Sequence, residues 1–398
     1  MSLQKQPWNH KLLAVSIEQA LKDIFHSNRH ADKVIESYLF QNKKWGSRDR
    51  RYFAEATYDI VRNWRYLNFL AGGEGSDVFD ILRIYHYLKD QTPTWGTLSA
   101  SEQSSINHKL KIPVSNAIKE SFPDWLDNLA EQELPGTWSN VIKKLNTVAP
   151  VDLRANSLKT DAKKLRELLS KESVDVEILS DFTLSLPVRK NVFVTKAFKD
   201  GLFEVQDRSS QLVAPFLDVQ PGHRVIDACA GAGGKSLHLG SLMKNKGKII
   251  ALDINEKKLT ELKKRAARNG IDNIETRLIE SSKVIKRLQD SADRLLLDVP
   301  CSGLGVLRRN PDNKWKLTKE KVEELWQLQR KLLADYSPML KSGGLMVYST
   351  CSVLPSENQN QIKWFLENFP QFKLITDIKI LPGPNKGDGF YMACLQKS

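Results

Sequence analysis

The feature that most constrains the fold is an alternation of strand-like and helix-like segments from about residue 217 onward. Short apolar runs predict strands at 224–228, 248–252, 273–278, 294–297 and 345–349. Amphipathic runs between them predict helices that include 234–243, 256–269 and 319–339. Strands that alternate with helices are typical of βαβ units, which build a parallel, doubly wound sheet. The C-terminal part of the chain is therefore predicted to be an α/β domain.

The first of these strands runs through Asp227 into a turn of small residues that opens the first helix. Glycines let the backbone approach a ligand closely, and a helix N-terminus presents free N–H groups. The second strand leads to Asp253, about 20 residues further on, where a carboxylate can accept hydrogen bonds from ribose hydroxyls. The pattern predicts a nucleoside-containing cofactor held by Cys229, Ala230, Gly231, Ala232, Gly233, Gly234, Lys235 and Asp253.

Two other ligand classes are alternatives for this segment. Gly234, Lys235 and Ser236 end like a phosphate-binding P-loop, but Cys229 occupies the position of that motif's first glycine. A dinucleotide-binding turn needs a third glycine where Ser236 stands. Both departures argue against these two classes of ligand. A glycine-rich turn that binds no ligand remains an alternative interpretation.

Two cysteines follow the fourth and fifth strands of the predicted sheet. Cys301 follows an Asp-Val-Pro segment that begins at Asp298, and Cys351 follows a Ser-Thr pair. Because the carboxyl ends of parallel strands meet at one edge of a sheet, both thiols are expected beside the cofactor. A single buried cysteine is usually inert packing, but two at equivalent strand ends indicate thiol chemistry.

A thiolate beside a nucleoside cofactor suits methylation of cytosine at C5, which is a poor nucleophile in the free base. Addition of a thiolate at C6 makes C5 able to attack an electrophilic methyl group, and the adduct then loses the C5 proton and the enzyme sulfur. Asp298 is expected to hydrogen-bond the N3 and amino edge of the ring. Lys235 is expected to position groups or to favour a thiolate.

Three segments, in this order, resemble the RsmB/Sun/NOP family of RNA cytosine-5 methyltransferases: Asp227–Lys235, Asp298–Ser302 and Ser349–Ser352. Shorter pieces of the same pattern are Arg154–Asn156, Val205–Ser210, Arg308–Asp312 and Gly387–Tyr391. The resemblance covers roughly residues 150–398 and implies a Rossmann-like class I methyltransferase domain that uses S-adenosylmethionine. The RNA contacts that it implies are Arg154, Asn156, Gln206, Asp207, Arg208, Arg308 and Arg309.

The resemblance gives the two cysteines different roles. In the family, the cysteine of the Thr-Cys motif is the nucleophile, which implies Cys351. The cysteine of the Pro-Cys motif helps to release the product, which implies Cys301. The target would be a cytosine flipped out of its stack in a structured RNA. The family usually has an aspartate near the adenine of the cofactor, and Glu280 is the nearest match in this chain.

Two regions precede the α/β domain, which is assigned to residues 216–398. Residues 148–215 are predicted to form a small α+β RNA-interaction module, with strands at 151–157, 174–179, 183–186 and 192–195 and a helix at 161–170. Residues 1–147 are predicted to form an all-helical domain, with helical runs at 12–24, 48–70 and 78–88 and a loop at 91–104.

The N-terminal region resembles, more weakly, the NusB-type helical RNA-binding domain through residues 47–53 and 58–64. That resemblance favours ribosomal RNA as the substrate, with transfer RNA as the first alternative. A basic patch at Lys43, Lys44, Arg48, Arg50 and Arg51 suits RNA phosphates, and a solvated helix start explains it equally well. A loop with Arg308, Arg309, Lys314 and Trp315 is expected to overhang the active site and contact RNA.

The net charge of +13 fits a polyanionic partner, and residues 1–150 contribute only +2 of it. Four cysteines without a CxxC pair predict a reduced, cytoplasmic protein, and no apolar run is long enough to predict a membrane span. Seven scattered histidines predict no metal site, and nothing demands more than a monomer. A non-catalytic RNA-binding factor in ribosome assembly is the alternative from another class, and the pair of cysteines argues against it.

Overall fold

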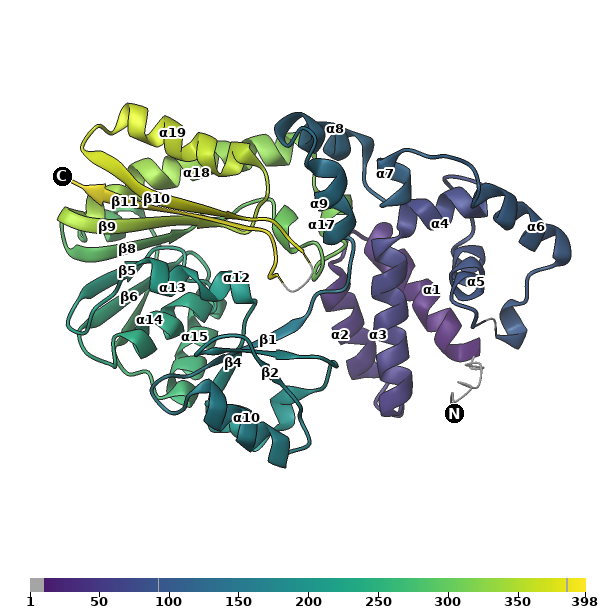
Figure 1. The fold of residues 1–398 in the computed structure, drawn as a ribbon, viewed down its shortest axis with the longest axis horizontal. Coiled ribbons are helices and arrows are strands. Elements are labelled where there is room, and N and C mark those ends of the chain that lie inside the picture. The colour runs from purple at the N-terminus through teal and green to yellow at the C-terminus, as the bar shows by residue number, and fades with distance from the viewer. Residues whose placement is uncertain (1–10, 92, 384–385) are drawn as a thin grey trace. The chain divides into compact units, whose positions relative to one another are not determined.

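The computed structural model describes residues 11–91, 93–383 and 386–398, and Figure 1 labels its helices and strands. These residues form two compact units. The helical unit comprises the chain up to Asn146 together with Leu307–Thr318, and the sheet unit comprises Thr147–Val306 and Lys319–Ser398. Each unit is described by itself.

The helical unit packs amphipathic helices around one apolar core. Its longer helices are α1 (Lys11–Phe25), α2 (Ala31–Gln41), α3 (Ser47–Arg62), α4 (Trp64–Ala71), α5 (Val78–Leu88), α6 (Ala100–Lys109), α8 (Asp124–Glu133) and α9 (Trp138–Leu145), and two single turns are α7 (Asn116–Lys119) and α17 (Asn313–Lys316). Helices α1, α3 and α5 meet through fully buried side chains such as Ile17, Ile60 and Ile81. These residues recur at the spacing of one helix face, which is why the sequence pattern predicted helices here.

Most of the predicted helical runs are present, with two differences. The run at 78–88 is α5 with those bounds. The run at 48–70 is two helices, because Asn63 departs from helical geometry between α3 and α4. The predicted loop at 91–104 gives way to α6 at Ala100, where Ser99 and Glu102 cap the helix N-terminus reciprocally.

Residues 307–318 pack with the helical unit, although they lie inside the segment assigned to the α/β domain. Lys314 is 1% exposed, and its Nζ donates to the backbone oxygens of Arg62 (2.8 Å) and Glu120 (3.3 Å) and to the Asn146 amide oxygen (3.1 Å). The expectation that Lys314 contacts RNA is wrong for this structure, because three protein oxygens hold its buried ammonium group. Burial also lowers the pKa of Lys314 well below its usual range.

The sheet unit contains a seven-stranded sheet with the strand order β10-β11-β9-β8-β5-β6-β7. The strands are β5 (Arg224–Asp227), β6 (Lys248–Asp253), β7 (Ile274–Leu278), β8 (Ala292–Asp298), β9 (Leu340–Thr350), β10 (Phe372–Ile380) and β11 (Phe390–Lys397). The five strands predicted from the sequence are β5 to β9, and they pair in parallel. Strands β10 and β11 add an antiparallel edge that the sequence analysis did not predict.

Helices cover both faces of this sheet, as Figure 1 shows. One face packs against α16 (Ser282–Lys286), α18 (Lys319–Tyr336) and α19 (Gln359–Asn368). The other packs against α13 (Val213–Phe216), α14 (Gly234–Leu242) and α15 (Glu256–Asn269). Along β8, Leu295 and Leu297 face the first layer and Leu296 faces the second, and all three are fully buried. Burial on both faces explains why the strands read as continuous apolar runs.

The α+β module also lies within the sheet unit. Its antiparallel sheet has the order β2-β3-β1-β4, formed by β1 (Val151–Ala155), β2 (Glu177–Ile178), β3 (Thr183–Leu186) and β4 (Phe203–Val205). Helix α10 (Ala162–Lys171) packs on it through Leu165 and Leu169. The predicted strand at 192–195 is wrong, since Val192–Val194 forms a single helical turn started by the Asn191 side chain.

Candidate active site

The two cysteines of the predicted site meet at the carboxyl ends of adjacent strands. Asp298 at the end of β8 lies in register with Ser349 in β9, so the loops that follow leave the sheet side by side. The Sγ atoms of Cys301 and Cys351 are 3.4 Å apart. The structure therefore brings together the two thiols that the sequence placed 50 residues apart.

A buried carboxylate fixes the loop that carries Cys301. Glu357 is fully buried and accepts hydrogen bonds from the Ser302 backbone N–H (2.8 Å), the Ser302 hydroxyl and the Gln329 side-chain amide (3.1 Å). The same Gln329 amide donates to the oxygen of Pro300, one residue before the cysteine. The sequence analysis missed Glu357, whose only signal was its place six residues after Cys351.

The neighbouring residue fixes the loop that carries Cys351. Asn358 is fully buried, accepts from the Thr350 hydroxyl, and donates to the backbone oxygen of Ser352 (3.1 Å). The Cys351 backbone oxygen in turn accepts from the N–H of Gly305 in the other cysteine loop (2.9 Å). A Cβ on Gly305 would stand 2.7 Å from the Cys351 oxygen and 2.1 Å from the Gly389 oxygen, so only glycine permits this approach.

Asp298 and Lys235 form an ion pair beside the thiols. Lys235 Nζ lies 2.6 Å from one Asp298 oxygen, and the Ser349 hydroxyl donates to the other at 2.8 Å. Burial by itself lowers the pKa of Lys235, but the attraction of Asp298, and to a lesser degree that of Cys351, raises it overall. The Lys235 ammonium group is thus charged at neutral pH.

The second thiol stays protonated. The hydrogen bond with Cys351 and then burial raise the pKa of Cys301 well above its usual range. Two negative sulfurs at this separation would repel each other, which is one cause of the raised pKa of Cys301.

The glycine-rich turn has the geometry of a cofactor cradle. The Gly231 backbone N–H donates to Asp253 at 2.8 Å, and the other Asp253 oxygen accepts from the Asn255 N–H at 2.8 Å. Gly233 has φ +85°, and a Cβ there would stand 2.4 Å from Leu262 Cγ. A Cβ on Gly231 would meet nothing within 4 Å, so this side of the turn borders open space.

A buried acid near the turn lacks one partner. Asp227 accepts from the Ser236 hydroxyl at 2.6 Å through one oxygen, and its other oxygen has no hydrogen-bond partner in the described part of the chain. Burial raises the pKa of Asp227 to about 7. Open space beside Gly231 and the free N–H groups at the start of α14 fit the polar methionine end of S-adenosylmethionine. The residues present thus fit the cofactor that the sequence predicts.

Two predicted cofactor contacts are placed differently. The side chain of Cys229 is half-buried, and burial raises the pKa of its thiol, so it is a neutral lining group. Glu280 is exposed just after β7, and the structure shows no role for it. Glu280 does lie at a strand end of the same sheet, and its contact with the adenine of the cofactor stays a prediction.

Three of the residues expected to contact RNA are buried in the protein: Arg154, Asn156 and Arg308. Arg154 donates to Gln206 and to the backbone oxygen of Gly234 (2.7 Å), and Asn156 donates to the oxygens of Gly201 and Asn269. These bonds join the α+β module to the cofactor turn and to α15. These protein–protein hydrogen bonds differ from the RNA contacts expected of Arg154 and Asn156. The local sequence could not predict that the two side chains would be buried.

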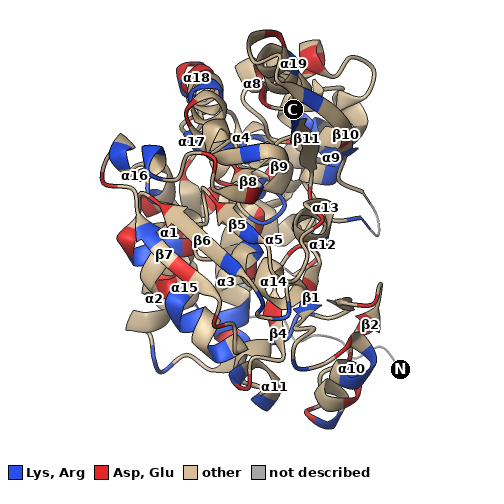
Figure 2. Ribbon diagram, turned by 90° about the vertical axis from the view of Figure 1, so that its left-hand side faces the viewer, with Lys and Arg blue, Asp and Glu red and all other residues tan. Residues whose placement is uncertain are grey.

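The remaining members of that group are half-buried. Asp207 caps α12 (Arg208–Gln211) and accepts from the Asp388 N–H, and Arg208 pairs with buried Asp152 at 2.7 Å. Arg309 is partly accessible. Helix α15, which carries several blue segments in Figure 2, presents the exposed lysines Lys257, Lys258, Lys263 and Lys264. Its two arginines instead bind buried Glu204.

The chain is similar in sequence to known proteins. A family model described as 16S rRNA methyltransferase RsmB/F matches residues 214–396, and a model of the ferredoxin-like domain of RsmF/B-like methyltransferases matches residues 122–195. A probable ribosomal RNA small subunit methyltransferase B from Synechocystis is 30% identical, covering 95% of this chain and 98% of the relative. The enzyme of that name from Shewanella oneidensis is 35% identical over 72% of this chain and 70% of the relative.

The chain belongs to the RsmB/F family of 16S rRNA methyltransferases. Membership confirms the family resemblance, the Rossmann-like α/β fold and S-adenosylmethionine-dependent RNA methylation as the class of activity. The crystal structure of PH0851 has the same fold, with a TM-score of 0.78 and 23% identity over 96% of this chain and 99% of that one. The NusB-like resemblance of the N-terminal region stays a prediction.

The ferredoxin-like family model also bears on the domain boundary. It begins at residue 122, whereas the sequence analysis started the α+β module at residue 148. The contacts of the structure divide the chain after Asn146, close to the sequence prediction. Within the described residues, no helix is long and apolar enough to cross a membrane, and no group of acidic, histidine and cysteine side chains is arranged to hold a metal ion.

Proposed function

We propose that this protein transfers a methyl group from S-adenosylmethionine to C5 of a cytosine in ribosomal RNA, through a covalent bond between Cys351 and C6. The observation that carries the proposal is the pair of thiols 3.4 Å apart, next to the Asp298–Lys235 ion pair. Most methyltransferases need no thiol nucleophile, because their target atoms are already nucleophilic. Cytosine C5 is not, so a thiol nucleophile placed beside the cofactor site is a specific indication of this reaction.

The first step is attack of the Cys351 thiolate on C6. The new S–C6 bond shifts the electrons of the C5–C6 double bond, and C5 becomes the nucleophile. The Lys235–Asp298 pair offers a donor and an acceptor to N3 and the amino group of the ring, which stabilises the adduct. S-adenosylmethionine, when bound, supplies the electrophilic methyl group that C5 accepts.

The second half of the reaction restores the aromatic ring. A base removes the C5 proton, the C5–C6 double bond re-forms, and the C6–S bond breaks so that Cys351 leaves as a thiolate. We assign Cys301 to this release, because its thiol touches the sulfur that must depart. Protonated Cys301 donates a hydrogen bond to that sulfur and so stabilises the leaving group.

Ribosomal RNA is proposed as the substrate because the relatives that align with the chain carry that specificity in their names. The exposed lysines of α15 provide a surface for RNA phosphates. Transfer RNA is the alternative substrate, and a binding factor without catalysis is the alternative function. A monomer and a cytoplasmic location remain predictions from the sequence.

The test is nucleoside mass analysis of RNA after incubation with the protein and S-adenosylmethionine. Unmodified small-subunit ribosomal RNA and transfer RNA are compared, with wild type, Cys351→Ala and Cys301→Ala. We expect 5-methylcytosine in ribosomal RNA with wild type, none with Cys351→Ala, and a covalent protein–RNA complex with Cys301→Ala. Methylation of transfer RNA alone would overturn the substrate, and cofactor binding without methyl transfer to any RNA would favour the binding factor.

A further inference from the structure

The helical unit contains a pocket of 860 Å³, which lies between the end of α1, helix α4, the glycine-rich segment before α5, and residues 307–318. All of its lining residues belong to the helical unit. Its volume is in the range of small-molecule sites, and it is larger than one nucleotide needs. No step of the proposed reaction uses it.

Aromatic rings form one wall of the pocket. Phe25 and Trp64 are stacked with their centroids 4.0 Å apart, and Trp315 meets Phe25 edge-on at 6.3 Å. The indole N–H of Trp315 donates to the Val61 oxygen at 2.9 Å, which fixes its ring. All three side chains are only half-buried, so part of each ring faces the pocket. Half-exposed, fixed aromatic rings are suitable for stacking of an unpaired base.

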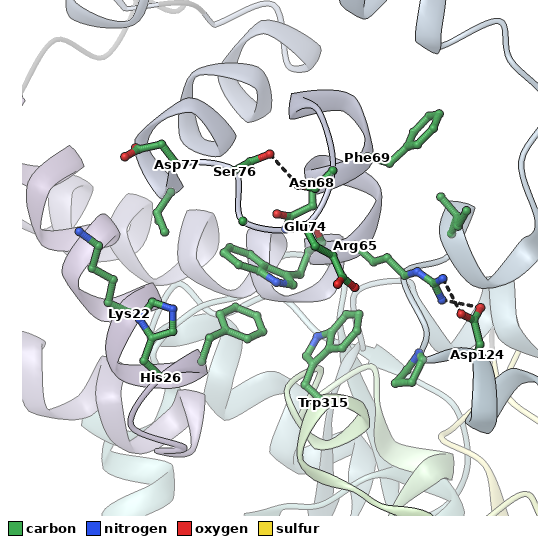
Figure 3. A pocket seen from close by; sticks show the side chains of 17 residues that line it. Lys22, His26, Arg65, Asn68, Phe69, Glu74, Ser76, Asp77, Asp124 and Trp315 are labelled. Atoms are coloured by element: carbon green, nitrogen blue, oxygen red, sulfur yellow. Dashed lines mark hydrogen bonds and ion pairs between the residues drawn. The ribbon is translucent and has the colours of Figure 1, made fainter.

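One charged group in the pocket has no protein partner. The carboxylate of Glu74 makes no hydrogen bond or ion pair with any residue that the structure describes. Figure 3 shows this side chain directed toward the middle of the pocket, between Trp315 and Arg65. Arg65 itself is held by a two-pronged ion pair with Asp124 at 2.8 Å, so it does not neutralise Glu74.

The segment that carries Glu74 keeps its backbone open toward a ligand. Gly73 and Gly75 have φ of +122° and +87°, which residues with a side chain rarely adopt. A Cβ on either would meet nothing within 4 Å, so it is the backbone conformation, and not lack of space, that requires glycine.

Lys22 and His26, at the end of α1, also line the pocket and are partly or fully exposed.

We propose that this pocket binds an unpaired guanine of the substrate RNA, packed against the aromatic wall of Trp64 and Trp315 and held at its Watson–Crick edge by Glu74. The inference rests on the proposed function for the existence of an RNA substrate. Guanine is the base that presents two adjacent donors, N1–H and the exocyclic amino group, to a single carboxylate. Adenine and cytosine pair one donor with an acceptor, and uracil places one donor between two carbonyl oxygens, which a carboxylate repels.

Charged side chains of both signs line the pocket, and the acidic ones are Glu74, Asp77 and Asp124. Lys22 and His26 lie on the exposed side of the pocket, where the phosphates that flank a bound base would be. Lys22 already forms an ion pair with Glu18 at 2.6 Å, which weakens its attraction for a phosphate. Base stacking and the carboxylate contact therefore provide most of the selectivity, and the phosphates add affinity without sequence preference.

The test measures binding of labelled single-stranded RNA pentamers by fluorescence anisotropy to the full chain. Each pentamer has one central guanine, adenine, cytosine or uracil flanked by uridines. We expect the guanine pentamer to bind tightest, and Glu74→Gln to weaken it about tenfold while the adenine pentamer changes by less than about twofold. Glu55→Gln is the matched control, because Glu55 is exposed on the same unit and does not line the pocket.

A second variant tests the stacking wall without removing the carboxylate. Trp64→Leu should weaken all four pentamers by a similar factor, because every base stacks on an aromatic ring. Equal binding of the four pentamers by wild type, or an unchanged guanine preference in Glu74→Gln, would overturn the inference. Either result can coexist with formation of 5-methylcytosine, whereas guanine binding without methylation would leave this site standing and remove the proposed function.

Discussion

Two adjacent buried residues, Glu357 and Asn358, bind different cysteine loops. Substituting each in turn therefore tests the separate roles of the two thiols. The Glu357 carboxylate binds the loop of Cys301. The Asn358 amide binds the loop of Cys351. We predict that Glu357→Ala accumulates a covalent enzyme–RNA complex, as Cys301→Ala should, and that Asn358→Ala loses both the complex and methylation.

The magnitude follows from the donors that lose their acceptor. In Glu357→Ala the Ser302 N–H, the Ser302 hydroxyl and the Gln329 amide would all be left without the carboxylate. The Gln329 amide keeps the Pro300 oxygen and the Ser302 hydroxyl keeps the Ser352 hydroxyl, so the Ser302 N–H is the donor left unpaired. A buried, unpaired polar group costs about 1–3 kcal/mol, which the loop can recover by moving. A displacement of about 1 Å at a reacting group lowers a rate roughly 100-fold, and we expect release of the product to slow by that factor.

The assay combines gel separation of the covalent complex with single-turnover methylation of labelled RNA. Glu357→Gln is the conservative variant, because it keeps the shape and one acceptor oxygen and should accumulate less complex than Glu357→Ala. Thermal unfolding of each variant checks that it folds. The reasoning is refuted if a folded Glu357→Ala forms no more complex than wild type, or if Asn358→Ala accumulates as much.

Three further predictions concern other parts of the molecule. Gly233→Ala places a Cβ 2.4 Å from Leu262 at a residue with φ +85°. Calorimetry should therefore show that S-adenosylmethionine binds this variant at least about tenfold more weakly than wild type. An unchanged affinity would contradict the proposal that the turn holds the cofactor. Because burial raises the pKa of Asp227 to about 7 from an ordinary 3.8, the folded protein keeps a proton that the unfolded chain releases. The free energy of unfolding without cofactor should fall by up to about 4 kcal/mol between pH 4 and pH 7, and denaturant titrations of Asp227→Asn should lack that component of the decline. Lys314→Met leaves three oxygens without their donor. It should lower the free energy of unfolding of the helical unit by about 2–4 kcal/mol, seen as a lower melting temperature. An equal or higher melting temperature would show that burying the lysine costs more free energy than its hydrogen bonds contribute.

The sequence predicted the parts of the fold that depend on local periodicity. Helix α5 and strands β5 to β9 were found because apolar residues recur at the spacing of one helix face or fill a strand buried on both sides. The meeting of Cys301 and Cys351 was also predictable, since parallel strands deliver their carboxyl ends to the same edge of a sheet. None of these inferences needed a contact between distant residues.

Other parts of the site depend on partners far away in the chain. Glu357 lies 55 residues from the serine that it binds, and no local pattern announces that pairing. Arg154 was expected to contact RNA because of the family resemblance, yet it is buried and its guanidinium donates to the cofactor turn. The antiparallel pairing of β10 and β11 at the sheet edge was not predicted, because it depends on which strand edge remains free after the parallel core forms.

What the sequence by itself determined was the class of protein: a parallel α/β methyltransferase domain with a glycine-rich turn and two thiols at strand ends. What only the tertiary structure decided was the assignment of residues 307–318. They follow the Cys301 loop in the chain, but Lys314 and Trp315 pack among helices encoded more than 160 residues earlier. The physical reason is that a buried ammonium group needs several oxygen acceptors, and where such a set exists is a property of the folded chain, not of any local segment.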